Sequence, residues 1–224
     1  MNTKSQIVAA LTLAGFVTLA TTLVADPAKK SESKNAAAES KSAEGKLPPG
    51  WTPEDLQAYI EASTPGKMQE YLGRGAGEWT GKSTMWMAPG GDPVTSESRS
   101  KVTSLMDGRY MKCEMEGEIP GMGPYQGLGY VGYDNVARKF ISTWIDNHST
   151  GFMIGEGSLS KDEKVLTWNF TFTCPITKKP TVMRQIETIT SPTTKTLVMY
   201  GPDPKSGKEF KMMSIELTRK QQTR

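Results

Sequence analysis

The chain has 224 residues, enough for one ordinary domain with additional segments. Its 27 basic and 24 acidic residues give a formal net charge of +3, and they are scattered along the sequence. Proteins that bind nucleic acid usually carry a basic patch or stripe, so this distribution argues against nucleic acid as a partner.

Residues 1–25 have the features of a signal peptide. Lys4 supplies a positive charge, residues 7–25 are mainly apolar, and small side chains offer cleavage after Ala20 or Ala25. An uncleaved membrane anchor is the alternative, because about 20 apolar residues can span a bilayer. Several threonines in the stretch argue against the anchor. We therefore expect an exported protein, periplasmic or secreted, with no membrane-spanning segment once the signal is removed.

Residues 26–50 differ in composition from the segments on either side. They are rich in Ala, Ser, Lys and Glu, and Leu47 is their one apolar residue larger than Ala. Such a segment buries too little apolar surface to offset the entropy lost on ordering. We expect a disordered linker, with weak solvated helix at residues 36–38 as the alternative.

Residues 51–76 are predicted to form one or two short helices. Thr52 and Thr64 each stand before a proline, an arrangement that places a capping hydroxyl before a proline at the first helical position. Apolar residues follow at helical spacing: Leu56, Tyr59 and Ile60, then Met68, Tyr71 and Leu72. These helices either cover one end of the domain that follows or pack on its outside.

Residues 77–220 are predicted to form an all-β domain of about ten antiparallel strands. Apolar or small residues alternate with polar ones, and turn residues such as Asp107-Gly108 separate the runs. The expected strands are residues 78–87, 95–106, 109–119, 125–134, 139–146, 152–160, 165–174, 181–190, 196–200 and 209–219. Ten consecutive antiparallel strands with a shared apolar face predict an up-and-down β-barrel.

Several segments resemble domain of unknown function family 1579. They are Gly77-Glu78-Trp79-Thr80-Gly81, residues 85–90, 127–135, 142–147 and 149–151, and the closing residues 208–213. The resemblance covers roughly residues 53–220. It implies a calycin-type, lipocalin-like barrel in an exported bacterial protein, and it implies no established activity or catalytic residues.

The strand pattern also predicts which side chains face the inside of the barrel. Strand alternation places a set of apolar side chains there: Trp79, Met85, Met111, Cys113, Met115, Trp168, Phe170 and Phe172. Small residues on the second and fourth strands are expected to leave space, and Ser98 and Arg184 are candidate polar groups. An apolar concavity of this kind suits a small apolar or amphipathic ligand. The alternative is a barrel that packs shut.

Residues with catalytic or metal-binding chemistry give no site in the sequence. Asp146, His148 and Ser149 share one turn, which makes a catalytic triad or a haem ligand a poor interpretation. Methionines could bind copper, but they are spread over many strands and suit a core or pocket lining. We therefore predict no catalytic residues, no metal and no cofactor.

The two cysteines, Cys113 and Cys174, are both predicted to face inward from strands that are not neighbours. A disulfide needs Cα atoms within about 7 Å, which an open barrel does not allow, so two free thiols are favoured. A bond remains the alternative if the barrel is flattened at that point.

The function predicted from the sequence is binding of a small apolar or amphipathic molecule in the barrel, without catalysis. A structural or protein-interaction module is the first alternative, and a barrel without a cavity would favour it. An enzyme acting on a small hydrophobic substrate is the second. It would need an acid or base in the cavity, for which Asp146 and Glu156 are the first candidates.

Overall fold

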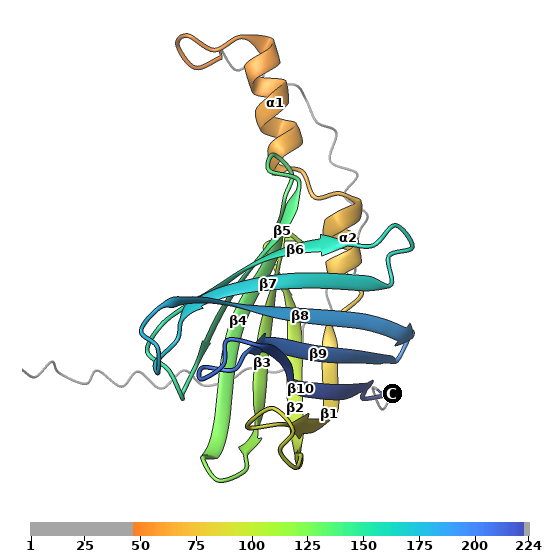
Figure 1. Ribbon diagram of the computed structural model, residues 1–224. Helices are drawn as coiled ribbons and strands as arrows, with labels where there is room; N and C mark the ends of the chain where they lie inside the picture. Colours follow the sequence, from red (N-terminus) through yellow and green to blue (C-terminus); the bar gives the residue numbers. More distant parts are fainter. Residues whose placement is uncertain (1–46, 222–224) are drawn as a thin grey trace, which may run out of the picture. The chain divides into compact units, whose positions relative to one another are not determined.

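The computed structural model of the chain describes residues 47–221 (Figure 1). The predicted signal peptide, residues 1–25, and all but the last four residues of the predicted linker lie outside this range. Within residues 47–221, no helix is long and apolar enough to cross a membrane.

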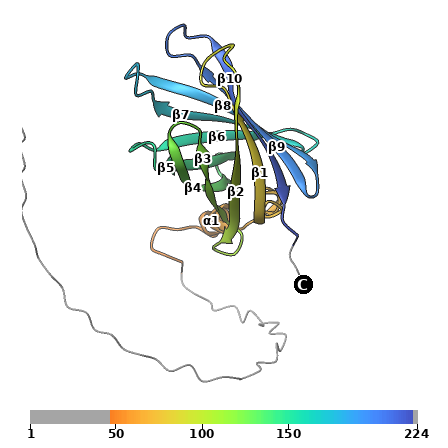
Figure 2. The ribbon, with the colours of Figure 1, turned by 90° about the horizontal axis from the view of Figure 1, so that it is seen from below.

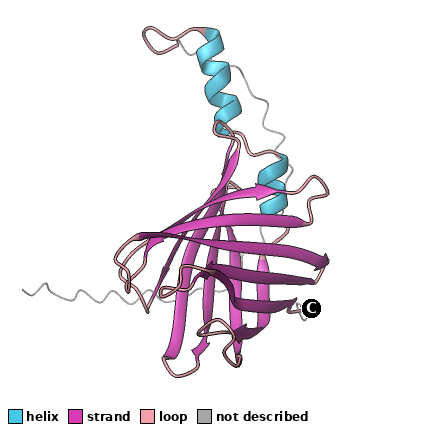
Figure 3. Cartoon of the chain, in the orientation of Figure 1, coloured by secondary structure: helices cyan, strands magenta, loops and turns pink. Residues whose placement is uncertain are grey.

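Ten antiparallel strands form a closed barrel, as predicted from the sequence (Figure 3). Each strand pairs with the next along the chain, and β1 closes the barrel by pairing with β10, from Trp79 opposite Arg219 to Met85 opposite Met213. The strands are β1 (Gly77–Met85), β2 (Val94–Leu105), β3 (Tyr110–Ile119), β4 (Gly123–Asp134), β5 (Lys139–Asp146), β6 (Met153–Leu159), β7 (Val165–Thr173), β8 (Pro180–Ser191), β9 (Thr194–Pro202) and β10 (Glu209–Arg219).

The two halves of the sheet run in different directions. In Figure 1 the strands β2 to β4 stand steeply, whereas β7 to β10 lie across them. Figure 2, turned by 90°, shows the sheet curving round so that its first and last strands meet. A strongly coiled sheet of this kind leaves an interior between the crossing halves.

The strands form where the sequence alternates between apolar and polar residues. In β7, Leu166, Trp168 and Phe170 are buried, and the residues between them are exposed or half-buried. The β2–β3 turn also follows its sequence signal, because Asp107 and Gly108 have φ values of 55° and 85°. A glycine takes such a φ without steric strain, and an aspartate tolerates it better than most residues do.

The strand β9 differs from its predicted range, residues 196–200, because it extends at both ends. The β8–β9 connection is only Pro192 and Thr193, so pairing continues to Ser191 opposite Thr194. This tight connection places Lys195 in the sheet, two residues from the turn.

The helix α1 (Pro53–Ser63) begins at a capping box. Thr52 Oγ1 accepts a hydrogen bond from Asp55 N at 3.2 Å, and Asp55 Oδ2 accepts one from Thr52 N at 2.8 Å. The helix has no buried residue, so its apolar side chains do not pack on the barrel. Its C-terminal end is held by Asn135, whose Nδ2 donates to Thr64 O at 2.9 Å.

The helix α2 (Lys67–Gly73) covers one end of the barrel. Its Tyr71 and Leu72 are buried in a cluster with Met111, Phe140 and Leu166 from the strands. Gln69 is also buried, and its Nε2 donates to Tyr133 O at 3.1 Å and to Asn135 Oδ1 at 3.0 Å. Of the two arrangements left open by the sequence, α2 therefore covers an end of the barrel.

Candidate ligand-binding cavity

The barrel encloses a cavity of about 1310 Å³. Side chains on the inward faces of all ten strands line it, so the barrel is not packed shut. At the end away from α2, the lining continues onto the loops through Met87, Met122 and Ile176, which are mostly exposed. Ligand sites in proteins commonly have volumes of about 300–1,000 Å³, so this cavity is large enough for a lipid-sized molecule.

The structure places all eight predicted lining residues on the cavity wall. Three of them are buried from solvent, namely Met111, Trp168 and Phe170. The other predicted residues also line the cavity: Trp79, Met85, Cys113, Met115 and Phe172. That these residues contact a ligand stays a prediction.

The small residues on the second strand leave space, as expected. Ser96, Ser98 and Ser100 all line the cavity, and Ser98 is buried beside Ser83, with their hydroxyl oxygens 3.4 Å apart. Hydroxyls at these positions occupy far less volume than the methionines and aromatic rings on other strands. The β2 side of the cavity is therefore both open and polar.

On the fourth strand, Gly127 and Gly129 leave space that a neighbouring ring partly fills, and Gly129 lines the cavity. The Trp144 ring of β5 covers both, and a Cβ added to Gly129 would lie 2.6 Å from Trp144 Cε3. The ring is held in place because its Nε1 donates to the Tyr125 hydroxyl at 2.9 Å. The glycines therefore accommodate a ring from the neighbouring strand.

A charged pair that the sequence analysis missed also lines the cavity. Lys195 Nζ lies 2.8 Å from Glu187 Oε1. The exposed fraction of the side chain is 15% for Lys195 and 21% for Glu187. Of the candidate polar groups, Ser98 faces the cavity as expected. Arg184 does not, because its guanidinium bonds Glu209 at 2.9 Å on the outside, and Gln185 faces inward instead.

The Trp79 ring lies next to this charged pair. Lys195 Nζ is 4.9 Å from the centre of the ring, and Arg219 Cζ is 4.3 Å from it. Both distances fit a cation–π interaction. Arg219 also donates to the backbone carbonyls of Ala76 and Arg74, and Trp79 Nε1 donates to Gly75 O at 3.0 Å. These bonds connect the indole and the Arg219 guanidinium to the segment that follows α2.

The charges of this pair affect the pKa of two other titratable groups. Burial raises the pKa of the Cys113 thiol to about 11, with the nearby Lys195 charge opposing the rise and Glu187 adding to it. Burial also raises the pKa of Tyr71 well above its usual range, and Glu187 adds to this shift. The Cys113 thiol on β3 and the Tyr71 hydroxyl on α2 therefore both lie close enough to the pair for its charges to shift their pKa values.

The sequence profile of a family described as "Protein of unknown function (DUF1579)" matches residues 64–219. The chain belongs to this family. The match covers α2 and the whole barrel, so the cavity lies entirely within the family domain, and the resemblance inferred from the glycine- and tryptophan-containing segments is confirmed.

Solved structures share the barrel fold at low sequence identity. An S-type phycobiliprotein lyase from Guillardia theta is 10% identical, with a TM-score of 0.51 over 74% of this chain and 98% of the lyase. Rv2717c from M. tuberculosis is 14% identical, with a TM-score of 0.52 over 70% of this chain and all of that protein. No curated protein matches the chain. At these identities the likeness concerns the fold alone.

The residues considered for acid–base chemistry lie away from the cavity wall. Glu156 forms an exposed ion pair with Lys139 at 2.6 Å, and Asp146 Oδ1 accepts a hydrogen bond from the backbone N–H of His148. The His148 ring lies 3.0 Å from Pro124 O and stacks on Tyr125. The contacts of Asp146 and His148 belong to the end of β5, the β5–β6 turn and the adjacent strand β4, whereas the Glu156–Lys139 pair joins β6 to the start of β5.

The described residues contain no group of three or more His, Cys, Asp or Glu side chains arranged to hold a metal ion. Cys113 and Cys174 are free thiols in the structure, in agreement with the interpretation favoured from the sequence.

Proposed function

We propose that this chain binds a small, largely apolar molecule inside its barrel and does not transform it chemically. The observation that carries the proposal is the cavity of about 1310 Å³ with its lining of methionine and aromatic side chains. Methionine is adaptable and polarisable, so a methionine-rich wall can contact ligands of different shape.

Burial of apolar ligand surface supplies the driving force. At about 25 cal/mol per Å², a ligand that buries about 300 Å² of apolar surface gains about 7.5 kcal/mol before the costs of immobilisation. The exposed apolar side chains Met87, Met122 and Ile176 line the route from the loops into the cavity. They provide apolar contacts for a ligand that enters at the end away from α2.

The proposal is tested by native mass spectrometry of the full chain, produced in an exporting bacterial host and purified without detergent. We expect an additional mass that disappears on denaturation. Binding of a neutral probe, N-phenyl-1-naphthylamine, is measured in parallel by its fluorescence after the protein has been delipidated.

Two neighbouring residues of β2 give a matched pair of variants. Ser100 lines the cavity, whereas Lys101 is exposed on the outer face of the same strand. Ser100→Phe is expected to reduce both the additional mass and the binding of the probe, and Lys101→Phe is expected to leave both unchanged. Equal effects of the two variants would contradict binding inside the barrel, as would a wild-type protein that binds neither a cellular molecule nor the probe.

We also propose that the protein acts outside the cytoplasm, in the periplasm or secreted. Lys4 followed by the apolar stretch of residues 7–25 supports this proposal. Cell fractionation and N-terminal sequencing of the mature protein test it, with an expected new N-terminus at residue 21 or 26. Intact protein confined to the cytoplasm would overturn it.

A further inference from the structure

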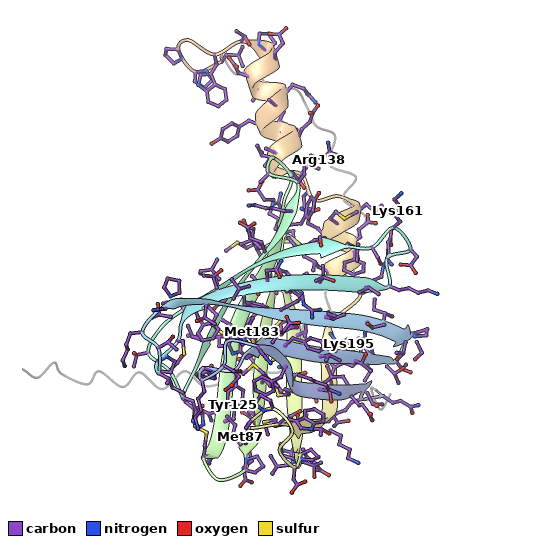
Figure 4. The ribbon with its side chains drawn as sticks, viewed as in Figure 1. Met87, Tyr125, Arg138, Lys161, Met183 and Lys195 are labelled. Carbon is purple, nitrogen blue, oxygen red and sulfur yellow. The ribbon has the colours of Figure 1, made fainter. Side chains whose placement is uncertain are left out.

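We propose that the α2 end of the cavity binds the carboxylate head of a long-chain amphipathic acid, with Lys195 as its principal contact. The inference rests on the proposed function, because it names the class of ligand that the cavity takes. Figure 4 places Lys195 and Met183 between Arg138, near the helices, and Met87 and Tyr125 at the other end.

Lys195 retains hydrogen-bonding capacity toward the cavity. Its ammonium group has three protons, and the structure assigns one hydrogen bond to it, to Glu187 Oε1 at 2.8 Å. The Trp79 ring, 4.9 Å away, contacts the same group. Since Lys195 and Glu187 both line the cavity, the remaining donor capacity is available to a bound molecule.

The charges at this end favour an anion. Glu187 is matched by Lys195, and Arg219 adds a second positive charge that contacts backbone carbonyls and Trp79. At the rim, Glu163 pairs with both Lys67 and Arg74, which leaves a further positive excess. A negative head group entering this end therefore meets more cationic side chains than carboxylates, in a partly desolvated setting where charge interactions are strong.

Neutral hydrogen-bonding groups accompany the cations. Gln185 is one inward position along β8 from Glu187, and its side chain is buried. The Tyr71 hydroxyl on α2 lies close enough to the pair for the Glu187 charge to add to the rise in its pKa. Residues Gln185 and Tyr71 both line the cavity, so each places a neutral hydrogen-bonding group where it can contact a bound head group.

The rest of the wall fixes the direction of the ligand. Toward the end away from α2, the inward positions are mainly apolar: Met85, Met115, Phe172, Met199 and Met213. An amphipathic molecule then places its head beside Lys195 and its hydrocarbon chain toward the loops. A single lysine with neutral donors suits a compact monoanionic carboxylate, whereas phosphate sites more often use the paired donors of arginine.

The test compares two probes that differ only in the head group, dodecanoate and 1-dodecanol, in displacing N-phenyl-1-naphthylamine from the delipidated full chain. The wild-type protein is expected to bind dodecanoate more tightly than dodecanol. Lys195→Met is expected to weaken the binding of dodecanoate about tenfold or more and to change the binding of dodecanol much less, since only the acid carries a negative charge that pairs with the Lys195 ammonium. The control is Lys82→Met, which removes an exposed lysine from β1 and should change neither probe.

A second substitution is expected to have the opposite effect on dodecanoate binding. Glu187→Gln removes the carboxylate that competes with the ligand for Lys195. It is therefore expected to raise the affinity for dodecanoate several-fold without changing the affinity for dodecanol. If Lys195→Met does not fold, the double variant Lys195→Met with Glu187→Leu replaces the pair by apolar groups, a change that buried pairs often tolerate. The double variant should still bind dodecanol and should no longer bind dodecanoate more tightly than dodecanol.

The outcomes separate this inference from the proposed function. If both dodecyl probes bind equally well and neither Lys195→Met nor Glu187→Gln changes their ratio, the head-group site is overturned and ligand binding in the barrel stands. If Glu187→Gln weakens dodecanoate, the assignment of the head to Lys195 is also overturned. If neither dodecyl probe binds the wild type, the head-group site is overturned; if the naphthylamine probe also fails to bind and native mass spectrometry shows no additional mass, the proposed function itself fails.

Discussion

The reactivity of Cys113 provides a direct test of how desolvated the cavity is. The thiolate is the form that reacts with alkylating agents. Burial raises the pKa of Cys113 from an ordinary 9.0 to about 11. At pH 8 an ordinary thiol of this kind is about one-tenth ionised and Cys113 about one-thousandth, so we expect alkylation of Cys113 to be about a hundredfold slower.

The assay uses a Cys174→Ser variant, so that Cys113 is the single thiol, and follows iodoacetamide labelling by intact-protein mass spectrometry. The folded protein is compared with the same variant in guanidinium chloride at pH 7 to 10. The rate in the folded state should rise about tenfold per pH unit across this range, and N-phenyl-1-naphthylamine in the cavity should slow it further. A folded rate within threefold of the unfolded rate at pH 8 would refute the reasoning that the cavity wall at Cys113 is desolvated.

The same pKa shift predicts a loss of stability at alkaline pH. Because the pKa of Cys113 is higher in the folded state than in the unfolded state, its contribution is fully present below pH 9 and is lost between pH 9 and 11. Two pKa units correspond to at most about 2.7 kcal/mol. Other groups titrate in this range, so the measured quantity is the difference in the free energy of unfolding between wild type and Cys113→Ala as pH rises. A difference independent of pH would contradict the shift.

Three further substitutions test the packing that supports the cavity. Phe140→Ala removes one of the most buried side chains, whose ring packs against Tyr71, and should lower the free energy of unfolding in urea by about 3–5 kcal/mol. Gly129→Val places a Cβ 2.5 Å from Thr143 O and 2.6 Å from Trp144 Cε3 and should lower the melting temperature. A melting temperature at or above that of the wild type would contradict the close approach of these atoms to the glycine. Glu163→Gln breaks two ion pairs with exposed partners and should lower the free energy of unfolding in urea by less than about 1 kcal/mol. A larger loss would mean that these pairs fix α2 on the barrel.

The strands were predictable because the information that specifies them is local. In β3, Met111, Cys113 and Met115 alternate with charged residues, so a single face can be buried. The turn at Asp107-Gly108 then determines which residues of β2 and β3 lie opposite each other, and Val102 pairs with Cys113. Closure by β1 and β10 follows once every strand has to pair with its neighbours.

The charged pair was not predictable from the same signals. In β8 the inward Gln185 and Glu187 are as polar as the outward Arg184, so alternation does not identify the inner face. Lys195 sits two residues beyond a tight turn, where a lysine is ordinarily exposed. Only the closure of the barrel shows that both charges face the cavity, because the inner face of β9 is fixed by pairing with β8 and β10.

The aromatic content of the inner face did not by itself indicate whether the barrel is filled, and the structure shows why. A Cβ added to Gly155 would lie 2.6 Å from the Phe170 ring, and one added to Gly157 would lie 2.7 Å from the Trp168 ring. Each glycine is directly opposite its aromatic residue in the pairing of β6 with β7, as Gly129 is opposite Trp144 in the pairing of β4 with β5. The rings therefore lie against the neighbouring strand and thicken the wall. A glycine opposite an inward aromatic residue keeps the ring out of the centre, and this arrangement allows a barrel rich in tryptophan and phenylalanine to remain hollow.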